Sequence, residues 1–293
     1  MDAVVFYALL RFRRSRTVIR GDSVVTFQPR LLARDPPSPS IPTTMAYMTD
    51  CLIAFGANEG DPAKTFRETE SLLRNLNGVS KLRPSSIHQT DPVGGPAGQS
   101  VYLNAAFRLS TSWTAKRLHQ ALIDIETSLG RQRHQRWGSR KVDLDLLLYG
   151  EQEFQVRGSS HTAELVVPHP RMSFRRFVLL PAVEVAADLL HASSGLTIGE
   201  LVQHLDSTPQ HIIWITDDTR AAEKICERVQ NELKSKWKFS IVQPVQAMDQ
   251  FGRLLVFDTH DFEVKYCQPV LDLSEYDSRR KKIELLAAIE AMI

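Results

Sequence analysis

The sequence predicts an α+β protein of two units: a ferredoxin-like split βαβ sandwich over residues 50–205 and a second small α/β module over residues 206–293. Two observations lead to this fold class. Between Cys51 and Gly150, short apolar runs alternate with amphipathic helical patterns in the order strand, helix, strand, strand, helix, strand. Further strand and helix patterns begin after residue 206.

The first strand and helix of the sandwich are identified by their ends. CLIAFGAN, residues 51–58, is a short apolar run with a glycine near its end, which is typical of a buried strand. Asp61-Pro62 provides an N-cap and a first helical residue, and apolar residues then recur at helical spacing until Gly78 ends the helix. A second strand is expected over residues 79–88.

The second half of the sandwich begins with a glycine- and proline-rich loop over residues 90–100. A third strand is expected over residues 102–111, and a helix from about Thr114 to Leu129 that Gly130 ends. VDLDLLLYG, residues 142–150, predicts the fourth strand. The apolar residues expected on one face of it are Val142, Leu144, Leu146 and Leu148.

Residues 1–49 differ from the rest, because they are rich in arginine, poor in acids and end with the proline-rich stretch DPPSPSIPTT at 35–44. Three interpretations are open: an organellar transit peptide, a weak membrane-surface segment, or an over-extended translation start with Met45 or Met48 as the initiator. The last is favoured because the globular pattern begins immediately afterwards. We expect this segment to be disordered or non-native.

Composition excludes several classes of protein. The hydrophobic share of 43% and the charged share of 24% are ordinary for a soluble globular chain, and Lys+Arg 36 against Asp+Glu 34 gives no global basic field for nucleic acid or acidic membranes. The three cysteines, Cys51, Cys226 and Cys267, are far apart and show no disulfide framework or zinc spacing. We therefore expect a cytoplasmic protein.

Asp143 and Asp145 are the first candidate functional pair. Residues i and i+2 of a strand point to the same face, so these carboxylates would lie about 7 Å apart and repel each other. A divalent cation would remove that repulsion, and Mg²⁺ prefers one or two carboxylates together with phosphates and water. The alternative is an exposed edge strand with polar residues facing outward.

An arginine-rich loop precedes this pair. Arginine matches phosphate oxygens two bonds at a time, so acids beside it indicate a site for a magnesium nucleotide. The indole of Trp137 could stack on a flat ring, and Gly138 would let the loop close over a ligand. A solvated basic loop is the alternative. The arginines are Arg131, Arg133, Arg136 and Arg140.

A second basic cluster follows in VVPHPRMSFRRFVLLP, residues 166–181. His169 lies between two prolines, and Arg171, Arg175 and Arg176 follow it. This pattern favours an anion ligand, with a purely structural histidine as the alternative.

Together these motifs resemble the 6-hydroxymethyl-7,8-dihydropterin pyrophosphokinase family of the folate pathway. The blocks occur in the family's order over about residues 51–205, roughly half the chain. They are Gly56-Ala57-Asn58-Glu59-Gly60, Thr90-Asp91-Pro92-Val93-Gly94, Tyr102-Leu103-Asn104-Ala105, Ile125 to Arg131, Arg136 to Asp145, and Val167 to Met172 with Arg175 and Phe177. The chain departs from the family's usual residues at Ala57, His88 and Ser139.

The resemblance implies transfer of an intact pyrophosphoryl group from ATP to the hydroxymethyl group of the dihydropterin, leaving AMP. It implies that Asp143 and Asp145 hold two Mg²⁺ ions and that Arg131 and Arg140 are catalytic. The residues it implies for ATP are Glu126, Arg133, His169 and Arg175. Those it implies for the pterin are Thr90, Val93, Asn104, Trp137 and Phe177.

Residues 206–293 lie outside the resemblance. HIIWIT, KFSIVQ and RLLVFDT predict three strands, residues 278–293 a final amphipathic helix, and Asp217-Asp218 a helix N-cap. The preceding stretch, residues 193–210, is expected to close the first unit. We expect a docking or self-associating module rather than a second active site.

Two rival functions belong to other classes. A nucleotidyl cyclase or polymerase palm also carries paired aspartates on a strand, but it does not need the Thr90-x-Pro-x-Gly block or the Trp137 and Phe177 pair. An RNA-binding sheet needs exposed aromatic residues and a basic face on its strands. In this sequence the aromatic residues and arginines of the motifs fall in expected loops, which disfavours RNA binding.

Overall fold

The computed structural model describes residues 48–96, 98–131, 138–156, 164–233, 236–244, 250–259 and 266–293, and of the first 47 residues only the backbone of two short strands. These strands, β1 (Thr17–Arg20) and β2 (Ser23–Thr26), pair antiparallel. The remainder of residues 1–47 lies outside the described ranges, so the expectation for residues 1–49 stays a prediction.

The first sheet is antiparallel and carries the candidate site. Its strand order is β4-β6-β3-β7, with the short strand β5 paired to β6. The strands are β3 (Thr49–Ala57), β4 (Val79–Pro84), β5 (His88–Thr90), β6 (Tyr102–Thr111) and β7 (Asp143–Tyr149). The single strand expected over residues 79–88 is broken after Pro84, where the Ser85 hydroxyl oxygen accepts a hydrogen bond from the Ala106 N–H at 2.8 Å.

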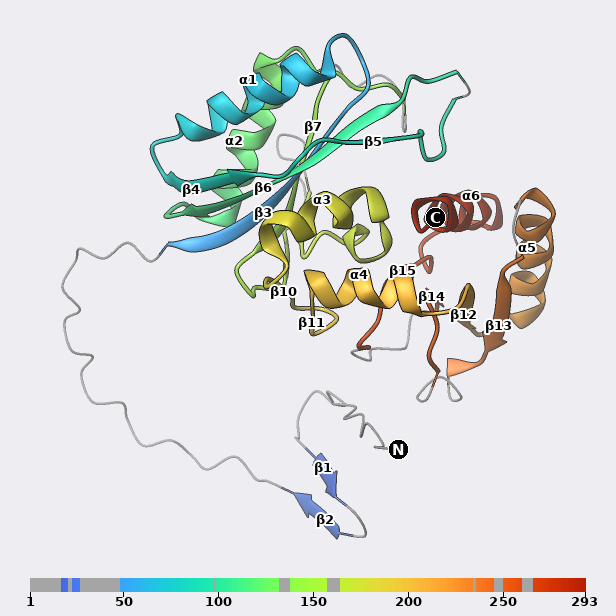
Figure 1. Cartoon of the computed structure of the whole chain (residues 1–293). Helices are drawn as coiled ribbons and strands as arrows, with labels where there is room; N and C mark the ends of the chain where they lie inside the picture. The colour runs from blue at the N-terminus through green and yellow to red at the C-terminus, as the bar shows by residue number, and fades with distance from the viewer. Residues whose placement is uncertain are drawn as a thin grey trace.

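Helices α1 (Pro62–Arg74) and α2 (Ala115–Ser128) cover one face of this sheet (Figure 1). Each begins at a side-chain cap: Asp61, the predicted N-cap, accepts a hydrogen bond from Lys64 N at 2.9 Å, and the Thr114 hydroxyl caps α2. Between helices and sheet lies an apolar core in which the rings of Phe66 and Phe107 stack with centroids 5.2 Å apart. Burial of each such side chain stabilises the fold by about 1.5–3 kcal/mol.

A β-bulge interrupts the alternation of β7. The register shifts between Leu52 and Ile53 of β3, so that Leu52 pairs with Leu148 while Ile53 pairs with Leu146. Leu146 faces α1 and α2, but Leu148 joins the core on the opposite face of the sheet. The prediction that these two leucines share a face is therefore wrong. The two aspartates lie before the bulge and keep the expected alternation.

A second helical layer packs on the opposite face of the sheet. It consists of the 3₁₀ turn η1 (Met172–Phe174), α3 (Arg176–Ala186) and α4 (Ile198–Ser207). The hairpin β10–β11 (Leu190–His191, Leu196–Thr197) accompanies these helices. The antiparallel strands β8 and β9 (Phe154–Val156, Leu165–Val167) instead contribute Phe154, Leu165 and Val167 to the core under α1 and α2. Helix α4 starts with a capping box of Thr197 and Glu200, a signal that the sequence reading overlooked.

The C-terminal residues form a parallel sheet in the order β13-β12-β14-β15. Its strands are β12 (His211–Thr216), β13 (Lys238–Val242), β14 (Leu254–Asp258) and β15 (Val270–Asp272), and its helices are α5 (Thr219–Glu232) and α6 (Ser278–Ala291). The continuous apolar run of β12 suits a strand that is covered on both faces. Asp218 caps α5, as predicted.

One apolar core joins the α3–α4 layer to the C-terminal residues. It includes Leu179 of α3, Leu201 of α4, Trp214 of β12 and Ile289 of α6. In Figure 1, α3 and α4 lie between the antiparallel sheet and the elements β12 to α6. The C-terminal residues are therefore packed on the first unit through a shared core.

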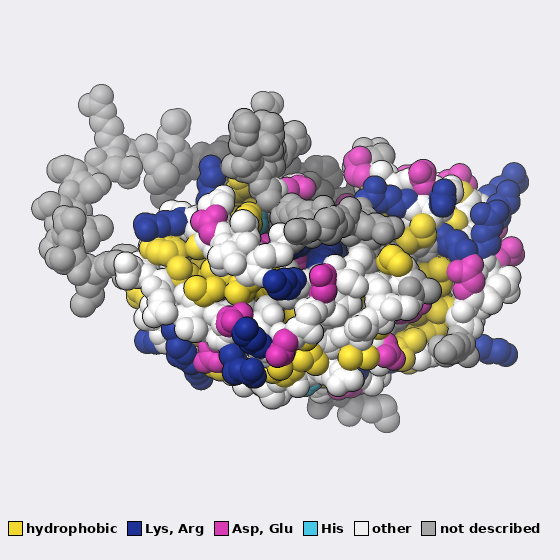
Figure 2. Space-filling view, turned by 90° about the horizontal axis from the view of Figure 1, so that it is seen from above, with side chains coloured by type: hydrophobic (Ala, Val, Ile, Leu, Met, Phe, Trp, Pro, Cys, Tyr) yellow, Lys and Arg dark blue, Asp and Glu magenta, His cyan; other side chains and the backbone are white. Residues whose placement is uncertain are grey.

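Charge is mixed over the surface. On the face seen in Figure 2, lysine and arginine side chains are interspersed with aspartate and glutamate, in agreement with the balanced composition. Recognition of an anion therefore depends on local clusters. Among the described helices, none combines the length and the apolar character that crossing a membrane requires.

Candidate active site

The candidate site is a cavity of about 350 Å³ on the α3 side of the antiparallel sheet. Its floor comes from the adjacent strands β6, β3 and β7, where Gly56 lies in register between Asn104 and Asp143. Ala54, two residues earlier on β3, pairs with Asp145 in the same way. These small side chains leave room above the sheet, so the polar groups of the neighbouring strands open on a shared space.

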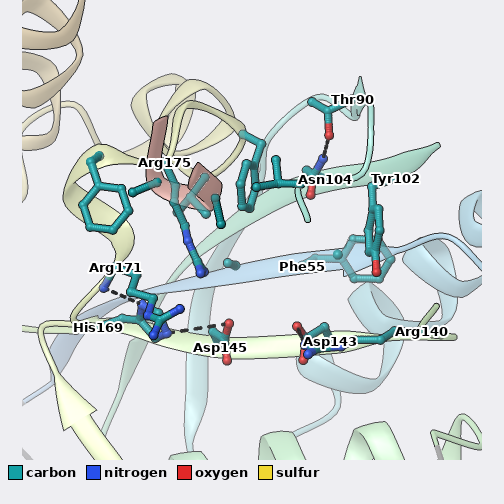
Figure 3. A pocket seen from close by; sticks show the side chains of 18 of the residues that line it. Phe55, Thr90, Tyr102, Asn104, Arg140, Asp143, Asp145, His169, Arg171 and Arg175 are labelled. Carbon is teal, nitrogen blue, oxygen red and sulfur yellow. Dashed lines mark hydrogen bonds and ion pairs between the residues drawn. The ribbon is translucent and has the colours of Figure 1, made fainter. Parts of the chain in front are cut away.

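The two aspartates have different surroundings. The side chain of Asp143 is 19% exposed, and its carboxylate pairs with Arg131 at 2.7 Å and with Arg140. Burial, and then the negative charge of Asp145, raise the pKa of Asp143 above its usual range. Asp145 is 43% exposed and lies 3.9 Å from the Nε2 atom of His169. The pair therefore combines one shielded carboxylate with one that is open to the cavity (Figure 3).

These carboxylates are the candidate metal ligands of the site. Within the described ranges, no three His, Cys, Asp or Glu side chains come together as a metal site. Asp91 and Glu284 also line the cavity, but Asp143 and Asp145 are the acids that project from one strand, and a bound substrate would add oxygen ligands to them.

Arg140 is held in place by the turn after β3. The Arg140 N–H donates to the Asn58 side-chain oxygen at 2.8 Å, and the Asn58 N–H donates to the Arg140 carbonyl at 3.0 Å. The Asn58 amide also donates to the Ser100 carbonyl at 3.1 Å. On the other side of the loop, the Tyr102 hydroxyl donates to the Gly138 carbonyl at 3.1 Å. Asn58 and Tyr102 therefore fix the segment that presents Arg140.

Glu126 lies behind Arg131 and does not line the cavity. Its side chain is 3% exposed, pairs with the Arg131 guanidinium and accepts a hydrogen bond from Leu144 N at 2.7 Å. Burial raises the pKa of Glu126 to about 7, although Arg131 opposes that shift. Glu126 thus connects α2 to β7 and orients Arg131 toward Asp143.

His169 is held as a neutral imidazole. Its backbone N–H donates to the Leu147 carbonyl at 2.9 Å, and its Nδ1 accepts from the backbone N–H of Arg171 at 3.2 Å. The ring proton therefore lies on Nε2, on the side of Asp145. Burial, followed by the charges of Arg175 and Arg171, lowers the pKa of His169 to about 3. The ring can donate a hydrogen bond to an anion without carrying charge.

Arg175 extends from the start of α3 across the cavity toward the strand that carries Asp145 (Figure 3). Its guanidinium carbon lies 5.6 Å from the centre of the Phe177 ring. Burial and the charge of Arg171 lower the pKa of Arg175 to about 10. The group remains a cation at neutral pH, desolvated and aimed at the cavity.

The remaining predicted residues fall into two groups. Thr90, Val93, Asn104 and Phe177 line the same cavity, and the Asn104 amide donates to the Thr90 hydroxyl at 2.8 Å (Figure 3). The predicted residues Arg133 and Trp137 lie outside the described residues. The structure therefore joins most of the predicted site on one cavity.

One wall of the cavity comes from residues that the sequence reading did not include. Leu271 of β15 and Glu284, Ala287 and Ala288 of α6 face it. A signal did exist, because Glu284 precedes the buried Ala288 by four residues and so lies on the apolar face of its helix. The sequence alone does not show, however, that this face of α6 lies at the same cavity as His169.

Comparisons with known proteins show which family the chain is similar to. Residues 52–187 match the family model described as 7,8-dihydro-6-hydroxymethylpterin-pyrophosphokinase (HPPK). The chain is 34% identical over 157 residues to a 2-amino-4-hydroxy-6-hydroxymethyldihydropteridine pyrophosphokinase of Synechocystis sp., covering 54% of this chain and 76% of that protein. It is 41% identical over 133 residues to the protein of the same name from Bacillus subtilis, covering 45% of this chain and 75% of that protein.

Among solved structures, the Plasmodium falciparum HPPK-DHPS wild type aligns with a TM-score of 0.43 and 10% identity, covering 73% of this chain and 57% of that one. This likeness is too distant to add to the family assignment.

Proposed function

Because this chain belongs to the 7,8-dihydro-6-hydroxymethylpterin-pyrophosphokinase family, we infer that it is a transferase acting on ATP and 6-hydroxymethyl-7,8-dihydropterin. It transfers a pyrophosphoryl group from ATP to the hydroxymethyl oxygen and yields AMP and the dihydropterin pyrophosphate, a step in folate biosynthesis. One observation carries this function: Gly56 pairs with Asn104 on one side and with Asp143 on the other, so the Asn104 amide and the Asp143 carboxylate line the same cavity.

The chemistry is a displacement at the β-phosphorus of ATP. The hydroxymethyl oxygen forms a bond to that phosphorus, the bond to the bridging oxygen of the α-phosphate breaks, and the hydroxyl proton leaves to water. Such a reaction is accelerated mainly by positioning and by stabilisation of negative charge. We assign the stabilisation to Arg131 and Arg140, whose guanidinium groups both pair with Asp143; Arg140 and Asp143 line the cavity, and Arg131 is connected to it through Asp143.

The ATP phosphates are assigned to the second basic cluster. Arg175 is a desolvated cation aimed at the cavity, and His169 offers a neutral Nε2–H beside Asp145. Arg133 is assigned to the same substrate on its position in the sequence. Glu126 supports the ATP side indirectly, since it holds Arg131. Cationic and neutral donors together fit a polyphosphate better than a single charge would.

Magnesium fits the donor set. Asp143 and Asp145 project from one strand into the cavity, and the raised pKa of Asp143 reports the repulsion and burial that a cation would relieve. We propose that the pair holds two Mg²⁺ ions together with ATP. Bound magnesium would supply neutralisation of the triphosphate charge.

The pterin is assigned to the part of the cavity that Asn104, Thr90, Val93 and Phe177 line. Asn104 and Thr90 form a hydrogen-bonded pair that can read the polar edge of a pterin ring, with Val93 beside them. Phe177 lines the cavity from the α3 side and offers a flat apolar surface. We propose that Trp137 provides the second surface of a stack around the ring.

The division of the chain into domains is also proposed. We propose that residues 50–205 are a ferredoxin-like pyrophosphokinase domain and that residues 206–293 are a small α/β module that docks on it and also permits self-association. Supporting the first proposal is the strand order β4-β6-β3-β7 with α1 and α2 on one face. We further propose a cytoplasmic location, supported by the free state of Cys51, Cys226 and Cys267.

The activity is tested by mixing the purified chain with ATP, Mg²⁺ and 6-hydroxymethyl-7,8-dihydropterin and separating the nucleotides by chromatography. We expect AMP to appear only when the pterin is present. Release of ADP, or nucleotide turnover that does not depend on the pterin, would refute the proposed function.

A further inference from the structure

Glu284 of α6 is buried against the loop that carries His169 and Arg175. Its side chain is 2% exposed, and its Oε2 atom lies 2.6 Å from the Nη1 atom of Arg171. The Nη2 atom of Arg171 donates to the Tyr276 hydroxyl at 3.3 Å. The side chain of Arg171 is thus held at both terminal nitrogens by residues from beyond position 206.

Arg171 connects this contact to the reaction centre. Its backbone N–H donates to the Nδ1 atom of His169, and that bond fixes the ring with Nε2 on the side of Asp145. A shift of the Arg171 side chain would move the backbone atom on which the orientation of His169 depends. Glu284 therefore acts on His169 through one intermediate residue.

The Glu284 carboxylate offsets the positive charges that lie close together around Arg171. Arg175 lies close enough that the charge of Arg171 lowers its pKa, and His169 responds in the same way. Without a carboxylate, the two desolvated guanidinium groups would repel each other. Glu284 also lies 3.8 Å from the Nε atom of Arg280 on its own helix, so the carboxylate stands between two cations.

The contact lies at the wall of the cavity. Besides Glu284, the wall includes Leu271, Ala287 and Ala288, all from β15 and α6. The residues that match the family model end at 187, so this wall comes from outside the shared region. Met172 and Ile289 belong to the same apolar core, which joins the loop and the helix beside the ion pair.

We propose that Glu284 is a positioning residue of the ATP side of the site: by holding Arg171 it fixes the segment from His169 to Arg175 in its productive arrangement. The C-terminal unit is thereby a working part of the active site. The inference rests on the proposed function, because its readout is the use of ATP by the pyrophosphokinase.

The experiment compares the full-length chain with its Glu284→Gln variant in the AMP assay, with ATP and pterin varied separately. The substitution keeps the size of the side chain and removes its charge. We expect the KM for ATP to rise by about tenfold, as for the loss of a charged hydrogen bond, and the KM for the pterin to stay within about twofold. Glu284→Asp should restore part of the loss.

The matched control is Lys281→Gln. Lys281 lies on the same helix and pairs with Asp258 at 2.5 Å, but it does not line the cavity. We expect this variant to keep both KM values. A substitution that only destabilises the chain lowers the folded fraction and hence the apparent kcat, whereas it does not move the KM for ATP.

Each outcome decides a different point. Wild-type turnover with an unchanged KM for ATP in Glu284→Gln would overturn the inference and leave the proposed function standing. A wild-type chain that forms no AMP would overturn both. If melting curves show Glu284→Gln unfolded at the assay temperature, Tyr276→Phe removes only the second contact of Arg171. We then expect a smaller rise in the KM for ATP, of about threefold, and no rise would overturn the inference.

Discussion

Substitution of His169 by asparagine should make the fold less sensitive to acid. The Nδ1 atom of His169 accepts from Arg171 N, and an asparagine side-chain oxygen can occupy nearly the same position. His169→Asn therefore keeps the local hydrogen bond and removes the titrating ring. The variant isolates the energetic cost of a histidine that is held neutral.

The magnitude follows from the pKa of the ring. It is lowered from 6.5 to about 3 by burial, Arg175 and Arg171, so below pH 6.5 the unfolded chain binds a proton that the folded chain does not. Stability then falls as the pH falls, by about 1.36 kcal/mol per pH unit, which gives about 2.7 kcal/mol at a pH of about 4.5. Because the side chain is 22% exposed, solvent reduces this contribution, and we expect about 2 kcal/mol.

The assay is urea unfolding of both proteins, followed by tryptophan fluorescence at pH 7 and at a pH of about 4.5. Other acid-sensitive groups that do not interact with His169, such as His204, whose pKa is lowered by burial, titrate in both proteins and cancel in the comparison. The loss of unfolding free energy between the two pH values should be smaller in His169→Asn by about 2 kcal/mol. Equal losses in the two proteins would refute the assignment of a buried neutral histidine.

Three further substitutions test separate parts of the site. Asp145→Ala should reduce AMP formation by about a thousandfold or more, with an unchanged circular dichroism spectrum, because a carboxylate open to the cavity is lost; a normal rate would remove the metal assignment. Glu126→Gln should lose less unfolding free energy than the unaltered chain between a pH of about 4.5 and a pH of about 7 in urea titrations, because a buried carboxyl whose pKa is raised to about 7 ionises at a cost in the folded chain, and equal losses would contradict this. Asn104→Leu should raise the KM for the pterin by about tenfold without affecting that for ATP, whereas equal rises in both would place Asn104 elsewhere in the site.

The elements that carry the site were predictable because their signals are local. Asp61 and Thr114 are caps whose side chains bond within their own helices, and β6 follows its apolar pattern from Tyr102 to Thr111. The alternation along β7 placed both aspartates on one face. The bulge that moves Leu148 to the other face depends on pairing with Leu52, which no local pattern reports.

The features that the sequence did not predict depend on tertiary contacts. Helix α3 has an apolar face that matches the sheet, but Pro181 within it reads as a helix stop when the sequence is taken alone. Glu284 could be seen as an acid on an apolar helix face, but its partner Arg171 lies more than a hundred residues earlier. Contacts of this kind follow from packing of the two units and cannot be derived from spacing.

Transfer of an intact pyrophosphoryl group is tested most directly by following each phosphorus of ATP. The full-length chain would be incubated with Mg²⁺, the pterin and ATP labelled at either the α or the γ position. We expect the γ label in the pterin product together with the β-phosphorus, and the α label in AMP. An α label in the product would identify a nucleotidyl transferase, and a product that carries the γ-phosphorus alone would identify an ordinary kinase; either result would contradict pyrophosphoryl transfer.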